Sequence, residues 1–206
     1  EIRLSLVGSE MCIRDSEKIV VEHGEISLLE SLYENNLNTI ILQVTQNCNL
    51  RCQYCVYSGS YINRVHTNKR MSFETAVKTI DFLAAHSLNC NEVSIGFYGG
   101  EPLLEIELIK KAVSYAKEVF GEKKVNFNMT TNATLLNMDI ADFLVQNDFN
   151  ITISLDGPRN IHNKNRIFAN SNKGTFDLIM ENIALIREKY PFFDKKISFN
   201  AVIDLK

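Results

Sequence analysis

Residues 39–55 read TIILQVTQNCNLRCQYC, an apolar run followed directly by three cysteines. The β-branched residues of this run predict a buried strand, with Cys48, Cys52 and Cys55 just after its carboxyl end. Thiols so close in sequence must share one centre. A trio with C-x3-C-x2-C spacing can hold three corners of an iron-sulfur cube and leave the fourth iron open to a cofactor. We therefore predict a metal cluster with one open position here.

A closed zinc site is the alternative, and inert thiols are another. Structural zinc takes four ligands, usually from two separated pairs. The nearest candidates for a fourth ligand are His66 and Cys90, and neither belongs to a second pair. Disulfides are not expected, because the five cysteines are an odd count and the chain shows no secretory leader. A reducing, cytoplasmic location follows as a prediction.

Composition limits the possible partners. The 206 residues are 45% hydrophobic and 23% charged, which suits one substantial core. The net charge is -3 and no block of Lys and Arg occurs, so no nucleic-acid partner is expected. No apolar run approaches the length that crosses a bilayer, so no membrane partner is expected either.

The first sixteen residues, EIRLSLVGSEMCIRDS, show no periodicity, cap or signal-peptide layout. Part of this run looks like translated sequencing-adapter read-through, so we expect 1–16 to be a non-native leader and give Cys12 no functional weight. We expect 17–38 to form an N-terminal segment, with a strand at 18–21 and a helix at 26–33. The main domain would span 39–206 and be incomplete at its carboxyl end.

The rest of the chain alternates between strand and helix patterns. Further strands are expected at 93–98, 125–131, 151–155 and 197–203. Helices are expected at 72–87, 102–120, 138–147 and 175–189, with Ser72 and Thr175 as caps. This order predicts a parallel α/β architecture with right-handed crossovers.

Polar or glycine-rich groups follow the strands. The turn at 99–101, Asn132 and the pair at 156–157 come after the second, third and fourth strands, as Cys48 comes after the first. The carboxyl ends of parallel strands meet at one face, where ligands bind. We therefore expect these groups to share one site.

Together, these motifs carry a family resemblance. They read TQNCNLRCQYC at 45–55, YGGEPL at 98–103, TN at 131–132, SLDGP at 154–158 and IHNKNR at 161–166. In this order the chain resembles the radical S-adenosylmethionine (radical SAM) superfamily from about residue 39 to its end. It is most similar to the branch of anaerobic sulfatase maturases and SPASM-type peptide maturases, which carry a cluster-bearing carboxy-terminal extension.

The resemblance implies a partial TIM barrel of parallel β/α units, truncated after about five strands. It implies that Cys48, Cys52 and Cys55 bind a four-iron, four-sulfur (4Fe-4S) cluster whose open iron is chelated by S-adenosylmethionine. An electron from the cluster, supplied by a flavodoxin- or ferredoxin-type donor, would break a carbon–sulfur bond. The resulting 5′-deoxyadenosyl radical would abstract hydrogen from a peptide or protein substrate.

The resemblance also assigns roles at the glycine-rich turn. Gly99 and Gly100 would let the backbone approach the methionine moiety, and Glu101 would accept a hydrogen bond from its ammonium group. An ordinary strand-to-helix turn with a solvated carboxylate is the alternative. Tyr98 belongs to the same motif and to the cofactor-binding set.

The remaining cofactor-binding residues come from four motifs. Tyr54 would lie near the adenine, Ser154 near the ribose, and Arg166 would pair with the cofactor carboxylate. Simple packing or loop-tying roles are the alternatives. Asn132 completes the set, although Ala133 stands where the family usually has glycine.

Three further residues are expected to be structural: Asp156 as a turn brace, His162 as a hydrogen-bonding residue, and Cys90 as an inert thiol.

The leading functional hypothesis is ribosomal peptide maturation by crosslinking. Conversion of a sulfatase cysteine or serine to formylglycine is the runner-up. A non-catalytic zinc-binding module or an inactive fragment are the alternatives of another class.

Overall fold

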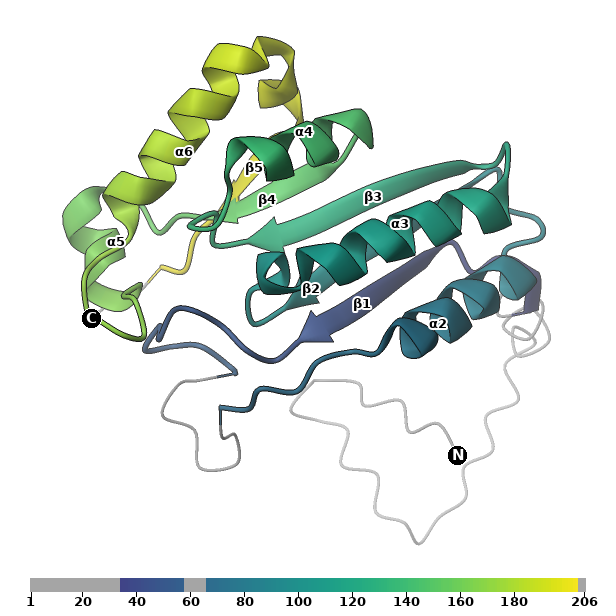
Figure 1. The fold of residues 1–206 in the computed structure, drawn as a ribbon, viewed down its shortest axis with the longest axis horizontal. Helices are drawn as coiled ribbons and strands as arrows, with labels where there is room; N and C mark the ends of the chain where they lie inside the picture. The colour runs from purple at the N-terminus through teal and green to yellow at the C-terminus, as the bar shows by residue number, and fades with distance from the viewer. Residues whose placement is uncertain (1–33, 58–65, 204–206) are drawn as a thin grey trace, which may run out of the picture.

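One parallel sheet organises the chain. The computed structural model describes residues 34–57 and 66–203, so the strand and helix expected at 18–21 and 26–33 lie outside the described residues. Its five strands are parallel and neighbour one another in chain order. They are β1 (Thr39–Thr45), β2 (Glu92–Gly99), β3 (Lys124–Thr131), β4 (Asn150–Ser154) and β5 (Ile197–Asn200). The predicted partial β/α barrel is confirmed (Figure 1).

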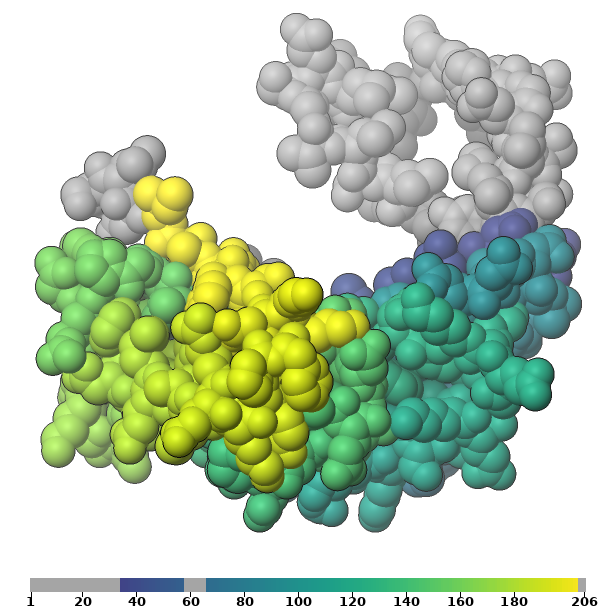
Figure 2. Space-filling model, turned by 90° about the horizontal axis from the view of Figure 1, so that it is seen from above, coloured from purple at the N-terminus to yellow at the C-terminus, as the bar shows by residue number. Residues whose placement is uncertain are grey.

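Helices connect the strands and cover one face of the sheet. They are α2 (Phe73–His86), η1 (Pro102–Glu105), α3 (Ile106–Phe120), α4 (Met138–Gln146), α5 (Arg159–Asn165), α6 (Phe176–Lys189) and η2 (Pro191–Lys196). In Figure 1, α2 and α3 lie in front of β1 to β3, and α6 packs near α4. Figure 2 shows the C-terminal elements, green to yellow, on one flank and α2 and α3 on the other. In the described ranges, no helix has both the length and the apolar character to cross a membrane.

The main core lies between the sheet and these helices. Alternate side chains of the strands are buried there, and the helices add apolar stripes from Ile80, Ile109 and Leu144. The rings of Phe97, Phe127 and Phe149 stack, with centroids 5.4 to 6.4 Å apart. Burying each such side chain stabilises the fold by roughly 1.5–3 kcal/mol, which fixes the strand register.

The other face of the sheet is open and carries both polar and apolar side chains. Alternating positions present uncharged amides and hydroxyls, and a hollow of about 220 Å³ lies over them. The hollow is lined in part by Ser94, Asn128, Thr130, Asn150, Thr152 and Ser198. A closed TIM barrel fills this side with bulky branched residues. Here amides and hydroxyls stand beside apolar residues such as Ile41, so the surface offers both kinds of contact.

The helix expected at 102–120 is divided in two. Pro102 opens the 3-10 turn η1, and the Glu101 side chain accepts from the Leu103 N–H at 3.0 Å. The α-helix begins only at Ile106. The buried acidic side chain of Glu101, which periodicity does not reveal, therefore caps the 3-10 turn that precedes the helix.

The last strand ends earlier than expected, at Asn200. Its final ladder bond joins Leu155 N to Asn200 O at 2.9 Å, after which Val202 N donates to Asp156 Oδ1 at 3.1 Å. The segment expected to continue β5 thus turns toward the carboxyl end of β4.

The cap of α6 is also different from the prediction. Thr175 makes no side-chain cap, because its hydroxyl donates to the Arg166 carbonyl at 3.2 Å. Asn163, from the unpredicted helix α5, accepts from the Phe176 N–H at 3.0 Å instead. A residue distant in sequence therefore starts α6.

Candidate functional site

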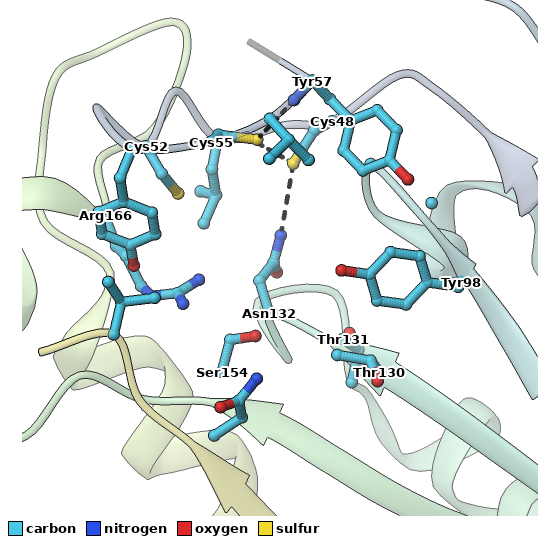
Figure 3. A pocket seen from close by; sticks show the side chains of 17 residues that line it. Cys48, Cys52, Cys55, Tyr57, Tyr98, Thr130, Thr131, Asn132, Ser154 and Arg166 are labelled. Carbon is cyan, nitrogen blue, oxygen red and sulfur yellow. Dashed lines mark hydrogen bonds between the residues drawn. The ribbon is translucent and has the colours of Figure 1, made fainter. Parts of the chain in front are cut away.

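A cavity of about 260 Å³ lies at the carboxyl ends of the strands. It gathers nearly all of the residues expected from the sequence (Figure 3). Those lining it are Cys48, Cys52, Cys55, Tyr54, Tyr98, Gly99, Gly100, Asn132, Ser154 and Arg166. Glu101 is the one expected site residue that does not line it.

Hydrogen bonds within the loop and to a second segment of the chain hold the cysteine loop in place. Arg51 Nη1 donates to the carbonyls of Cys48 and Leu50, both at 2.7 Å. A second segment packs alongside, with Arg51 N donating to Ile167 O and Ala169 N donating to Asn49 O, each at 2.9 Å. These bonds satisfy loop backbone groups that would otherwise compete for water.

Sequence reasoning missed the segment at 167–169. Leu50 and Phe168 form an isolated antiparallel bridge between it and the cysteine loop. The only signal was the apolar pair Ile167-Phe168 after the last motif, and periodicity cannot assign such a pair to a partner.

Two of the thiols, those of Cys48 and Cys52, lie in surroundings that favour the neutral form. Burial raises the pKa of Cys48 to about 12 and that of Cys52 to about 11. Leu50 N donates to Cys48 Sγ at 3.4 Å, and Tyr57 N donates to Cys55 Sγ at 3.3 Å. Bound iron would supply the positive charge that stabilises thiolates in such surroundings.

The three thiols line one cavity, and thiolates are the usual ligands of an iron-sulfur cluster. In the described part of the chain, no group of three or more His, Cys, Asp or Glu side chains is placed to hold one metal ion. A cube spreads its ligands around a larger volume, and three thiols around one cavity suit it.

The closed zinc site gains no support from its proposed fourth ligands. His66 Nε2 lies 3.0 Å from Arg51 Nη2, and burial followed by the Arg51 charge lowers the pKa of His66. Cys90 precedes β2, at the opposite end of the sheet, with its Sγ 3.7 Å from Leu37 O.

The two glycines are required by close approach of the backbone. An ideal Cβ at Gly100 would lie 2.1 Å from Asn47 O, and one at Gly99 would lie 2.1 Å from Thr45 O. Gly99 also has a φ of 146°, which other residues rarely adopt. The turn thereby packs against the chain that leads to Cys48. Its approach to a methionine moiety stays a prediction.

Glu101 lies beneath the glycine turn and is held by internal donors. Its side chain is fully buried, and Oε1 accepts from Thr131 Oγ1 at 2.6 Å and from Leu103 N at 3.0 Å. Oε2 accepts from Asn132 N at 2.8 Å. Burial raises the pKa of Glu101, and these three hydrogen bonds oppose that shift. The carboxylate therefore ties the ends of β2 and β3 together, and its bond to the cofactor ammonium stays a prediction.

Asp156 links three parts of the site. Its Oδ2 accepts from the Tyr54 hydroxyl and from Arg166 Nε, the latter at 2.9 Å, while Oδ1 accepts from Val202 N. The Arg166 guanidinium also lies 5.4 Å from the centroid of the Tyr54 ring. Asp156 therefore braces more than its own turn, since it fixes two residues of the cavity wall.

The pKa shifts of Asp156 and Arg166 are those expected of an ion pair. Burial alone raises the pKa of Asp156, but the hydrogen bonds from Arg166 and Tyr54 outweigh it and leave the pKa below its ordinary value. Burial also opposes the charge on Arg166, yet the bond to Asp156 leaves its pKa raised. Both groups are thus charged at neutral pH.

His162 is structural, as expected. It is fully buried, with Nδ1 accepting from Asp156 N at 3.3 Å and Nε2 lying 2.9 Å from Thr175 Oγ1.

The turn after β3 forms without glycine, because Ala133 adopts a left-handed φ of 58°. Asn132 consequently reaches the cavity.

This fold and site define the class of protein. The chain belongs to the Radical SAM superfamily, whose family model matches residues 42–200.

Individual relatives narrow the comparison. A cysteine-type anaerobic sulfatase-maturating enzyme of Clostridium novyi is 35% identical over 73% of this chain and 40% of its own length. The radical SAM cyclopropyl synthase TigE of Paramaledivibacter caminithermalis is 25% identical over 81% of this chain and 35% of its own. The solved structure of native anSMEcpe with bound AdoMet and the Cp18Cys peptide is 27% identical, with a TM-score of 0.65 over 80% of this chain and 42% of that one. The chain thus spans less than half the length of these three relatives.

Proposed function

We propose that this chain is the core of a radical SAM enzyme that reductively cleaves S-adenosylmethionine to modify a peptide or protein. The observation that carries the proposal is the single cavity that holds Cys48, Cys52 and Cys55 beside the glycine turn, Ser154 and Arg166. A cluster bound there would supply one electron to the cofactor.

The chain's own residues would position the reactants. The three thiolates would hold a 4Fe-4S cluster and leave one iron open. The Ser154 hydroxyl and the Arg166 guanidinium face the same cavity, where they suit a ribose and a carboxylate. Tyr54 offers an aromatic face beside them. Asp156 holds Arg166 in place through their ion pair.

The open face of the sheet supports a peptide substrate. Tyr98 and Thr130 line both the cofactor cavity and the polar hollow, so the two are continuous. Neutral amides such as Asn128 and Asn150 both donate and accept, which matches the main chain of a peptide. The solved relative with a bound peptide supports the same substrate class.

Two peptide modifications are candidates. Ribosomal peptide crosslinking is the first, because the FYGGEPLL run at 97–104 and the sequence around Tyr57 resemble peptide maturases. Formylglycine formation is the second, and the 35% identity to a cysteine-type sulfatase maturase favours it. We also propose a cytoplasmic location and a flavodoxin- or ferredoxin-type electron donor.

Turnover of a reconstituted sample tests the proposal. The full chain would be reconstituted anaerobically with iron and sulfide, reduced, and supplied with S-adenosylmethionine. Release of 5′-deoxyadenosine is expected from the wild type and from Cys90→Ser, but not from Cys52→Ser. A cluster-loaded protein that leaves the cofactor intact would reject the proposal. Mass analysis of a sulfatase peptide and of a precursor peptide encoded beside the gene would separate the two modifications.

A further inference from the structure

Asn132 makes a contact that cofactor binding does not explain. Its side chain is buried, with 6% of the residue exposed, at the carboxyl end of β3. The amide nitrogen Nδ2 lies 3.8 Å from Cys48 Sγ (Figure 3). A donor is therefore directed at the first of the three thiols.

The orientation of this amide is fixed by a closed ring of side chains. Asn132 Nδ2 donates to Asn49 Oδ1 at 3.0 Å, and Asn49 Nδ2 donates to Thr134 Oγ1 at 2.8 Å. Thr134 Oγ1 completes the ring by donating to Asn132 Oδ1 at 2.7 Å. Each group in such a ring polarises the next. Because Thr134 N also donates to Asn132 Oδ1, at 3.0 Å, the oxygen is held away from the thiol and the nitrogen must face it.

The backbone beneath the amide is equally constrained. Asn132 N donates to the buried Glu101 carboxylate at 2.8 Å, and Ala133 N donates to Thr131 Oγ1 at 3.0 Å. Two protons on Nδ2 serve two acceptors, one in the ring and one at Cys48. The ring holds the donor in place before any metal arrives.

Donors to a cluster sulfur stabilise the more negative, reduced state and thereby raise the reduction potential. We propose that Asn132 is a positioning residue for Cys48 and raises the reduction potential of the cluster through its Nδ2–H bond to Cys48 Sγ. This inference rests on the proposed function, since it requires a cluster at Cys48. It differs from the sequence-based expectation that Asn132 contacts the cofactor.

The contact is long, so a modest effect is expected. Removing it should lower the equilibrium constant of one-electron reduction by about tenfold, which corresponds to about 59 mV.

The test is an EPR-monitored potentiometric titration of the reconstituted full chain without S-adenosylmethionine. Asn132→Leu should carry the wild-type iron content and show the lowered midpoint. Asn126→Leu is the matched control: Asn126 also lies on β3, but its Nδ2 donates to Glu92 Oε2 at 3.2 Å, so its midpoint should equal that of the wild type. A loaded Asn132→Leu protein with the wild-type midpoint would overturn the inference.

A second measurement has a decisive outcome that is read from the wild-type protein alone. With 15N in the asparagine side-chain amides, pulsed EPR of the reduced cluster should detect a coupled 15N that is lost in Asn132→Asp, where oxygen replaces the amide nitrogen. Absence of that coupling in the wild type would overturn the inference while leaving the proposed function intact. Absence of any cluster in the wild type would overturn both.

Discussion

Replacing Asp156 by Asn should destabilise the protein through Arg166. The two side chains are 1% and 10% exposed, and Nε lies 2.9 Å from Oδ2. Removing one charge of a buried pair leaves the other without compensation, which typically costs about 3–5 kcal/mol. Asn still accepts hydrogen bonds, so we expect a loss near the lower end, about 3 kcal/mol.

Urea unfolding of the apo chain, followed by circular dichroism, measures this loss. Asp194→Asn is the matched control, because Asp194 pairs with Arg187 at 2.7 Å while the two side chains are 39% and 58% exposed. Exposed pairs contribute about 0–1 kcal/mol, so the control should lose no more than that.

A double-mutant cycle separates the charge effect from local packing. Asp156→Asn combined with Arg166→Gln should cost less than the sum of the single changes, because the stranded charge is then removed. If Asp156→Asn loses no more stability than Asp194→Asn, or if the two changes at the buried pair are additive, the reasoning from burial is refuted.

Three other changes probe the frame of the site. Gly100→Ala should prevent the turn from closing against Asn47 and should lower the midpoint of urea unfolding. Gly96→Ala should be tolerated, because its Cβ would meet only Ile41 and Ile40 atoms at 3.4 Å or more. Equal midpoints for the two variants would contradict the packing argument. Burial and the Arg166 charge lower the pKa of His162, so the free energy of unfolding should fall as the pH decreases below about 6.5. In His162→Gln, the free energy of urea unfolding should depend less on pH. Parallel pH profiles for the variant and the wild type would exclude His162 as the source of the effect. Asn163→Ala should cost about 1 kcal/mol by thermal unfolding through loss of the α6 cap, while Asn163→Asp should retain most of it; a neutral Ala variant would refute the capping role.

The sequence predicted the parallel sheet and most of the residues that line the cavity. The β-branched run at 39–45 predicted β1, and the parallel order then required Cys48, Gly99 and Asn132 to meet at one face. Ser154 was added by the family resemblance. Local pattern and topology determine these features together, which is why they can be read before a structure exists.

Side-chain partners distant in sequence could not be predicted in the same way. The residue type of Glu101 suggested an acceptor for a ligand, but it did not reveal the internal donors from Thr131 and Asn132. Thr175 has the residue type of a cap, yet its hydroxyl is used by Arg166 and Asn163 takes its place. Residue type gives the capacity to bond, and only tertiary packing decides the partner.

The central claim is that Cys48, Cys52 and Cys55 hold a cluster with one iron open to S-adenosylmethionine. The most direct measurement is the EPR spectrum of the reduced, reconstituted chain before and after the cofactor is added, together with metal analysis. We predict four irons per chain and a spectrum that changes on addition, because the cofactor binds the open iron. Stoichiometric zinc without iron, or a cluster spectrum unaltered by saturating cofactor, would contradict the account.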